Sequence, residues 1–472
     1  MGGAAVVGAL AALAVASPAA LAGRGPIYTS PGYKPTKIPK NFVPAKPPAP
    51  VVLQPSGNTP RVFVDGAGTA YIAFASPNGA AADAIRTCRL LRGGKACAAG
   101  ATLSPNQPAA GNDPQTNQDF DGPYPLAVGN ELLVVDSRCC NRVPTADGSF
   151  TENPVYLYTS EDAGATFTGP TDANPYAGVI GTQDPSGDAI VYGGDVPSIG
   201  LISSIQTGGT IFQGVPAGSF TTATANLSLR PDKQDASDGR LGLDGTRPIA
   251  AFSDFSGTIT VREWTGNGTV NDASQWTTLR ITGADQPRIA GGPRGIALLT
   301  EPSTSSGALS VRSIAPGGLS AGPPQVLTRT PARFPTLSAD PVSGMFTAAW
   351  INSSDESVHV RTSPDGRVWS PDQLVMRVPG GDLGELSAAA TADGGGFVVV
   401  RDASGAPTVY DGRVLAGQFG ATAATGKPGL GLVPGGSGPP SGDQKGFVAC
   451  SQIHFGSVDI QATAGCFLRD PK

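Results

Sequence analysis

Arginines are the residues of this sequence whose type and placement best suit binding chemistry. A guanidinium holds a carboxylate or sulfate through two parallel hydrogen bonds, so arginines that converge on one channel would form an anion site. The alternative is that these arginines cap strand ends, solvated or paired with aspartate. Those that precede short apolar runs are Arg61 in NTPRVFVD, Arg247 in GTRPIAAF, Arg288 in DQPRIAGG and Arg333 in ARFPTLS.

Few residues of this chain could support histidine-dependent catalysis or metal binding. His359 and His454 are the only histidines, which leaves almost nothing for a Ser-His-Asp triad or a histidine-rich metal site. His359 alternates with valines, as an ordinary strand residue does. Two acidic segments suit ordinary turns, although they are an alternative site for Ca²⁺. We therefore expect no metal and no cofactor, with Ca²⁺ the one alternative, at Asp113, Asp119 and Asp121 or at Asp232, Asp235 and Asp238.

Composition narrows the class of protein. The 472 residues carry 32 basic and 37 acidic side chains, a net charge of −5. This small, mixed charge has no basic cluster beyond a few lysines near the N-terminus, so no nucleic-acid face is expected. The 65 Gly and 44 Pro, with few long helix-forming runs, favour an all-β, turn-rich fold.

The N-terminal segment predicts export. Residues 1–22 contain the apolar run GGAAVVGALAALAVASPAALA, which ends in Ala-Leu-Ala, a small-x-small cleavage site before Gly23. A positively charged start is missing, so the segment could also remain as an uncleaved anchor. No later stretch approaches the ~20 apolar residues of a spanning helix. We expect a secreted or cell-surface protein, with no membrane-spanning part beyond such an anchor.

Export makes disulfides the natural state of the cysteines. Cys88 and Cys97 flank LLRGGKA, and a turn at Arg92-Gly93 would place them directly opposite each other in a hairpin, where a cross-strand bridge fits. Cys450 and Cys466 stand apart near the C-terminus and are expected to pair.

The remaining cysteines, Cys139 and Cys140, are adjacent and could form a strained vicinal disulfide. In a propeller their position after LLVVDS would lie near the channel mouth, where such a ring could serve as a ligand platform. The alternative is that they pair with the other four cysteines in a different arrangement.

A recurring unit runs through the middle of the chain. Each copy has a short apolar strand, a Gly/Asp turn and a second apolar strand, at a spacing of mostly ~40–65 residues, typical of a four-stranded propeller blade. We expect six or seven blades in one domain, residues 59–417. A stack of β-sandwiches is the competing fold, but it would not repeat at half a domain's length. The copies are residues 60–76, 123–137, 188–206, 246–264, 287–303, 334–353 and 386–404.

Segments of other composition flank this domain. Residues 23–58 are rich in proline and predict an extended tether, and residues 418–445 form a second linker rich in Gly and Pro. Residues 446–472 alternate apolar and polar side chains between the last two cysteines. They fit either a two-stranded disulfide flap or the start of a further module.

Two similar motifs lie on turns that join the last two strands of their units. Their Ser and Asp oxygens can accept hydrogen bonds from backbone N–H groups of a tight turn, Gly supplies a positive φ, and the aromatic ring covers the turn. Every residue of the motif is therefore used in holding a hairpin. The first copy, TSEDAGATF, has Ser160, Asp162, Gly164 and Phe167; the second, TSPDGRVWS, is one residue shorter and has Ser363, Asp365, Gly366 and Trp369.

These motifs resemble the Asp box of the sialidase, or bacterial-neuraminidase-repeat, superfamily of β-propellers, where the boxes lie at the periphery. The resemblance covers roughly residues 59–417. It implies a catalytic set of three arginines, a Tyr nucleophile paired with Glu, and an Asp acid/base. The Phe/Tyr-Arg-Ile-Pro motif of the family's first arginine is absent. Candidate equivalents of the arginines are Arg61, Arg288 and Arg333, with Tyr410 in PTVYDGR and Glu385 in LGELSAA as nucleophile and base.

The Asp boxes, the flexible linkers on both sides and the missing arginine motif favour binding over catalysis, and a lone tyrosine in a strand is more often a core residue than a nucleophile. We expect an exported, non-catalytic module that binds a glycan or an extracellular protein. A diverged exo-sialidase-type glycoside hydrolase is the alternative, and a purely structural wall component is the third.

Overall fold

The structure is a computed structural model, and the description below concerns only the parts of the chain that it describes. These are residues 51–54, 58–64, 69–78, 81–91, 96–103, 123–137, 142–144, 150–152, 155–172, 183–184, 189–192, 198–205, 209–216, 225–228, 237–254, 257–270, 272–292, 294–301, 308–315, 317, 319–339, 346–377, 385–390, 395–401, 407–413, 418–420, 447–451 and 464–469.

The described residues form antiparallel sheets, which confirms the all-β prediction. The one helical element among them is a short 3₁₀ turn, η2 (Ala273–Gln275), and no helix among them is long and apolar enough to cross a membrane. Seven sheets of four or five strands follow one another along these residues: β2 (Asn58–Val64), β3 (Ala70–Asn78), β4 (Ala81–Leu90) and β5 (Thr102–Leu103); β6 (Tyr124–Val128), β7 (Glu131–Ser137), β10 (Val155–Ser160) and β11 (Thr168–Asp172); β12 (Gln183–Asp184), β13 (Ala189–Tyr192), β14 (Ser198–Ile205), β15 (Gly209–Pro216) and β16 (Ala225–Ser228); β17 (Ser237–Asp244), β18 (Arg247–Asp254), β19 (Thr258–Trp264) and β20 (Trp276–Thr282); β21 (Asp285–Gly292), β22 (Gly295–Glu301), β23 (Leu309–Ala315), β24 (Ser320–Ala321) and β25 (Gln325–Thr328); β26 (Ala332–Ala339), β27 (Phe346–Asn352), β28 (Ser357–Ser363) and β29 (Gln373–Arg377); and β30 (Glu385–Ala390), β31 (Gly395–Arg401), β32 (Pro407–Arg413) and β33 (Gln418–Gly420).

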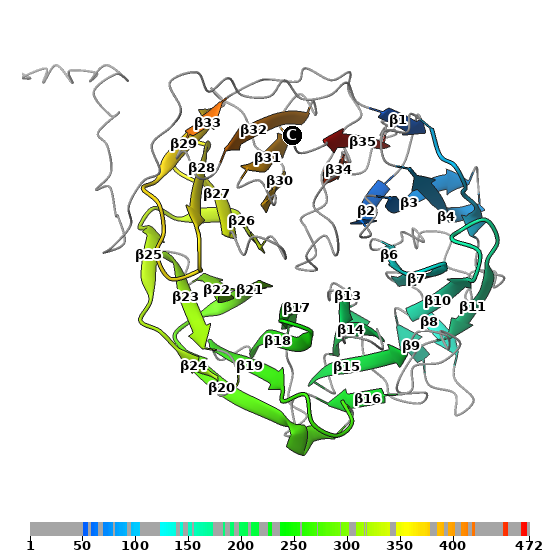
Figure 1. The fold of residues 1–472 in the computed structure, drawn as a ribbon, viewed down its shortest axis with the longest axis horizontal. Coiled ribbons are helices and arrows are strands. Elements are labelled where there is room, and N and C mark those ends of the chain that lie inside the picture. The colour runs from blue at the N-terminus through cyan, green and yellow to red at the C-terminus, as the bar shows by residue number, and fades with distance from the viewer. Residues whose placement is uncertain are drawn as a thin grey trace, which may run out of the picture.

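These sheets are arranged around a common centre, as the blades of a propeller are (Figure 1). The first strand of a sheet, such as β2, β6, β17, β21, β26 or β30, lies nearest the centre, and the last strands lie at the rim. Buried side chains of neighbouring sheets belong to the same core clusters, as Tyr71 and Leu133, Val261 and Leu298, and Leu299 and Trp350 do. The hydrophobic core is thus divided among the interfaces between sheets.

Two smaller sheets complete the description. β8 (Arg142–Pro144) pairs with β9 (Phe150–Glu152), and β1 (Val51–Gln54) pairs with β35 (Ala464–Arg469), which pairs with β34 (Phe447–Ser451). Strand structure therefore enters both segments expected to be linkers. β1 lies inside residues 23–58, where the VVLQ run is free of proline, and β33 begins residues 418–445. Residues 447–451 and 464–469 contribute a strand pair to a sheet that also includes β1.

One predicted repeat unit begins one strand later than its sheet does. Residues 246–264 fall on β18 and β19, the second and third strands of their sheet, and the inner strand is β17. The strand sequence SDGRLGLD contains two glycines, so the strand was not recognised from the sequence. A glycine of the neighbouring inner strand has a packing role. A Cβ on Gly291 of β21 would lie 1.6 Å from the carbonyl oxygen of Leu243, so glycine lets β17 and β21 touch backbone to backbone.

Candidate functional site

The first Asp box forms a hydrogen-bonded turn between β10 and β11. Ser160 Oγ accepts from the backbone N–H of Gly164 at 2.8 Å, and Asp162 Oδ1 accepts from those of Ala165 and Thr166 at 3.0 and 2.8 Å. The Thr166 backbone N–H, foremost among these donors, lowers the pKa of Asp162 to about 2. Gly164 has a φ of +89°, which glycine adopts without strain. Both polar side chains of this motif are occupied within the turn.

The second Asp box, between β28 and β29, has the same design in a shorter turn. Asp365 Oδ1 accepts from the N–H groups of Arg367 and Val368 at 2.9 and 3.0 Å, and Gly366 has a φ of +71°. Trp369 is completely buried and donates its indole N–H to the Gly366 carbonyl at 3.1 Å. Ser363 Oγ accepts from the Asp365 N–H at 3.3 Å. Both boxes join rim strands (Figure 1), so neither offers groups to the centre of the molecule.

A repeated register shift marks the beginning of four inner strands. In β2, β17, β21 and β26 an extra residue is inserted relative to the second strand of the sheet, a β-bulge. The residue that resumes regular pairing is Arg61 opposite Ala73, Arg240 opposite Ala251, Arg288 opposite Leu299, and Thr336 opposite Ala349. The bulge therefore places an arginine at the same point of three strands.

Two of the expected arginines do not share this position. Arg333 lies on the far side of its bulge, opposite Ile351, where β26 has Thr336 at the equivalent point. Arg247 begins the second strand of its sheet, and its guanidinium pairs with Glu263 at 2.8 Å and with Asp244. Neither is equivalent to Arg61 or Arg288, since spacing in the sequence does not reveal a one-residue bulge. Arg240, which had not been singled out, is equivalent.

Arg240 and Arg288 lie side by side on neighbouring inner strands. The close approaches of Gly242 to the carbonyl of Ile289 and of Gly291 to that of Leu243 fix the relative register of β17 and β21. In that register residue 240 falls opposite residue 288. Each guanidinium also bends back onto its own bulge: Arg240 Nη1 donates to the Gly239 carbonyl at 3.4 Å, and Arg288 Nη1 to the Pro287 carbonyl at 3.0 Å. Both arginines thus occupy equivalent positions in their strands, and both side chains fold back onto the bulge.

The backbone separates the candidate nucleophile and base. Glu385 begins the inner strand β30, whereas Tyr410 lies on β32, opposite Val398, which is itself opposite Ala388. Two strand spacings across and three residues along place the two Cα atoms about 14 Å apart. The two residues therefore lie on strands of one sheet that are not neighbours, and their roles as nucleophile and base stay predictions.

The structure contains a Ser-His-Asp arrangement that sequence reasoning did not find. On β28, Ser357 Oγ lies 2.8 Å from His359 Nε2, and His359 Nδ1 lies 2.9 Å from both carboxylate oxygens of Asp372. The indole N–H of Trp350 donates to Asn352 Oδ1 at 3.1 Å, which directs the Asn352 amide nitrogen at His359 Nε2, 2.8 Å away. Nε2 must then accept, so Nδ1 carries the proton that faces Asp372.

This tautomer is the one that a serine hydrolase uses, but a substrate has no access to the serine hydroxyl. Ser357 is completely buried, and its hydroxyl also bonds to Asp355. The histidine ring stacks on Trp350, with centroids 5.8 Å apart. A nucleophile has to reach its substrate, so the arrangement suits a buried polar network that holds the hairpin of β27 and β28.

The first sheet carries a disulfide beside a pocket. Cys88 on β4 is bonded to Cys97, with a Cα–Cα distance of 5.2 Å. The backbones of Cys450 and Cys466 lie opposite each other in β34 and β35. Cys139 and Cys140 lie outside the described residues, as do Asp113, Asp119, Asp121, Asp232 and Asp235 of the two acidic segments. Within the described part of the chain, no group of three or more His, Cys, Asp or Glu side chains could hold a metal ion.

Comparison with known proteins gives a distant likeness only. No family model matches the chain, and no curated protein does. Solved structures that it is similar to include a lectin from Burkholderia pseudomallei, at 13% identity over 78% of this chain and 99% of that chain with a TM-score of 0.49. An α-L-arabinanase from Penicillium chrysogenum follows at 11% identity, over 90% of this chain and 99% of that chain, with a TM-score of 0.37. Scores this low carry no argument, so the propeller-like fold rests on the sheets themselves.

Proposed function

We propose that this protein is an exported β-propeller that binds an acidic glycan without cleaving it. The binding site is the end of the propeller at which the inner strands begin, and we name it the hub site, defined by Arg240, Arg288 and Arg61. In this proposal the seven larger sheets are blades, which agrees with the upper of the two blade numbers expected from the sequence. The sheet of β1, β35 and β34 joins the two ends of the described chain.

The side-by-side placement of Arg240 and Arg288 carries the proposal. Two guanidinium groups at the same point of touching strands bring two positive charges together, and such a place suits an anion. Guanidinium also matches the planar geometry of a carboxylate. Arg61 follows an equivalent bulge in β2, so a third cation begins an inner strand in the same manner. A carboxylate-bearing sugar is the ligand that suits such a site on an exported protein.

The sialidase-type alternative has less support. Its three arginines would be Arg61, Arg288 and Arg333, but Arg333 is out of register with the other two. Its nucleophile and base, Tyr410 and Glu385, lie on strands that are not neighbours. An anion site without an adjacent nucleophile and acid binds its ligand and does no chemistry on it.

Removal of the paired arginines tests the proposal. Isothermal titration with sialyllactose, and with lactose as the neutral comparison, is made on the secreted chain and on Arg240→Ala/Arg288→Ala. We expect the double variant to bind sialyllactose on the order of a hundredfold more weakly, since two charge-assisted hydrogen bonds are lost. The matched control is Arg280→Ala/Arg294→Ala, which removes the same charge at two exposed positions away from the hub site.

Equal loss in the control and the hub variant would mean general electrostatic attraction and would contradict the proposal. A fluorogenic sialoside decides the enzymatic alternative: turnover that disappears in Tyr410→Phe would establish a hydrolase. Binding of neutral and acidic glycans alike, or of neither, would favour an extracellular protein partner or a structural role.

A further inference from the structure

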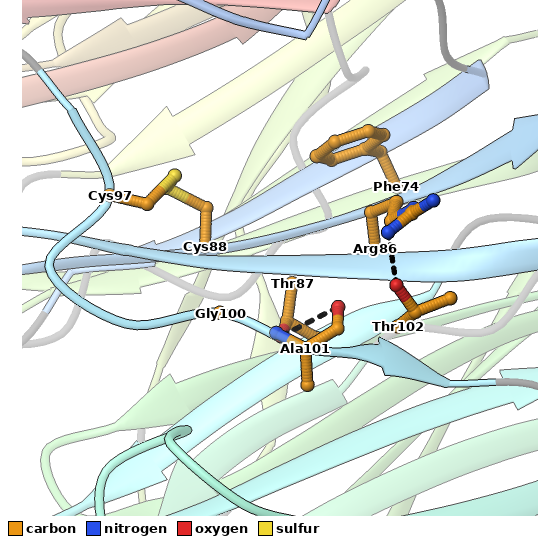
Figure 2. Close-up of a pocket in the computed structure, with 8 residues that line it drawn as sticks. All are labelled: Phe74, Arg86, Thr87, Cys88, Cys97, Gly100, Ala101 and Thr102. Atoms are coloured by element: carbon orange, nitrogen blue, oxygen red, sulfur yellow. Dashed lines mark hydrogen bonds between the residues drawn. A yellow bond between two sulfur atoms is a disulfide. The ribbon is translucent and has the colours of Figure 1, made fainter.

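A second binding pocket lies away from the hub site, on the first sheet. Phe74 of β3, Arg86 of β4 and Thr102 of β5 are opposite one another across three strands and therefore share one face. Figure 2 shows the Arg86 guanidinium between the Phe74 ring and the Thr102 hydroxyl, with the Cys88–Cys97 disulfide beside them. These residues line a cavity of about 210 Å³.

The wall of this pocket is held in place by covalent and hydrogen bonds. The disulfide ties residue 97 to β4, and the backbone N–H of Thr87 donates to the Ala101 carbonyl at 3.0 Å. The Thr87 hydroxyl accepts from the Ala101 N–H at 2.9 Å. Gly100 packs directly on the neighbouring strand, because a Cβ there would lie 2.4 Å from the Thr87 carbonyl oxygen. A site fixed in this way loses little entropy when a ligand binds.

The pocket has a positive charge without a matching negative one. Among the described residues, Arg86 has the Thr102 hydroxyl as its hydrogen-bond partner and no carboxylate. Its Nε–H is shielded from water and has no acceptor. A guanidinium that is partly buried with a single neutral partner favours an anion beside it.

We propose that this pocket binds the carboxylate of a sugar acid. Arg86 Nη1 is engaged by Thr102, so the carboxylate pairs with the other terminal nitrogen. Because Thr102 Oγ1 accepts from Arg86, its own hydrogen can be donated to a ligand oxygen. Gly100 is exposed along the wall, and its backbone N–H and carbonyl oxygen suit the sugar hydroxyls. This site does not depend on the hub arginines. Arg240 and Arg288 are on other sheets, and Arg61, on β2 of the same sheet, is not among the residues that line the pocket.

The test is a saturation-transfer NMR titration of the full chain with three small probes. Sodium glucuronate has both the carboxylate and the hydroxyls, propionate has the carboxylate alone, and glucose has the hydroxyls alone. We expect glucuronate to bind most tightly, propionate more weakly, and glucose not measurably. Arg86→Gln is expected to weaken the binding of glucuronate at least tenfold, because a charge-assisted hydrogen bond is lost. Arg89→Gln, on the same strand but with its side chain on the opposite face, is the matched control and is expected to bind within twofold of the parent.

The proposal is overturned if Arg86→Gln binds glucuronate as the parent does, or if glucose binds as tightly as glucuronate. Should Arg86→Gln fail to fold, Thr102→Val decides, since it removes one hydroxyl at an exposed position; unchanged affinity there contradicts the pocket. Binding that persists in Arg240→Ala/Arg288→Ala belongs to the pocket, and binding lost in that variant alone belongs to the hub site. The two proposals therefore fail separately.

Discussion

The two Asp boxes differ in how deeply their aromatic residues are buried, and this difference predicts unequal costs of removal. Trp369 is completely buried between two sheets, with its ring centroid 6.5 Å from that of Phe346. Phe167 packs on the first core cluster but is only partly buried. A fully buried aromatic side chain removes about 150–250 Å² from water, and at about 25 cal/mol per Å² this is about 4–6 kcal/mol.

Core Trp→Ala changes typically cost about 3–5 kcal/mol, so we expect Trp369→Ala to lower the free energy of unfolding by about that amount. Phe167→Ala is expected to cost about 1–2 kcal/mol, since its ring gives up less burial. Urea unfolding followed by far-UV circular dichroism measures both. Trp369→Phe, which keeps a ring but loses the bond to Gly366, is the intermediate control.

The result that would refute this reasoning is a larger loss for Phe167→Ala than for Trp369→Ala. A second refutation comes from binding: a Trp369→Ala protein that is folded yet has lost sialyllactose affinity would place the box in the binding site. A rim clamp predicts lower stability with unchanged affinity in the folded protein.

Three further predictions concern other contacts. Burial, followed by a hydrogen bond with Asp244, raises the pKa of Glu263 to about 7, so the folded state binds this proton more tightly than the unfolded state does. The free energy of unfolding is therefore expected to fall as the pH rises from about 4.5 through about 7. Urea titrations at several pH values measure this dependence, which Glu263→Gln is expected to remove. Reduction or Cys88→Ser/Cys97→Ser, which opens a loop with a sequence separation of 9, is expected to cost about 2–3 kcal/mol in the same assay. A fluorophosphonate probe is expected to leave Ser357 unlabelled in the folded protein, because that side chain is completely buried, and labelling found by mass spectrometry would establish an accessible nucleophile.

Local patterns in the sequence predicted the parts of the fold that depend on local physics. Alternating apolar runs between Gly and Asp turns gave the sheets, and the Asp boxes gave the joints between rim strands. In both cases the residues that define the feature bond to neighbours a few positions away, as Asp162 does to Thr166. Such features can be found without knowledge of the tertiary structure.

The candidate site depends on strand register and on contacts between residues distant in the sequence, and neither could be predicted from the sequence. Arg333 precedes an apolar strand as Arg288 does, yet a single inserted residue changes its position in the ladder. His359 gained a function in the polar network from Asp372, which lies 13 positions away on the approach to the next strand. Nothing in a strand's own alternation indicates which partner a histidine will meet.

One signal for the missed arginine was nevertheless present. Arg61 and Arg240 both begin the pattern Arg-x-x-x-Asp-Gly, in PRVFVDG and GRLGLDG. The pattern has a physical basis in the second copy, where a bulge precedes the arginine, strand residues follow, and the chain turns at Asp244-Gly245. Glycines inside GRLGLDG lowered its strand character, and the glycine that allows β17 to touch β21 is Gly291, on β21.

This close approach links the fold to the proposed site. If Gly291 carried a side chain, β21 would be pushed from β17, because the added carbon would lie 1.6 Å from the Leu243 oxygen. Arg240 and Arg288 would then separate, and one anion would no longer span both. Gly291→Ala leaves both arginines present, so it distinguishes the amount of positive charge from the spacing of two charges. We expect it to weaken sialyllactose binding about as much as the loss of one arginine does, and an unchanged affinity in a folded variant would show that the two arginines do not act together.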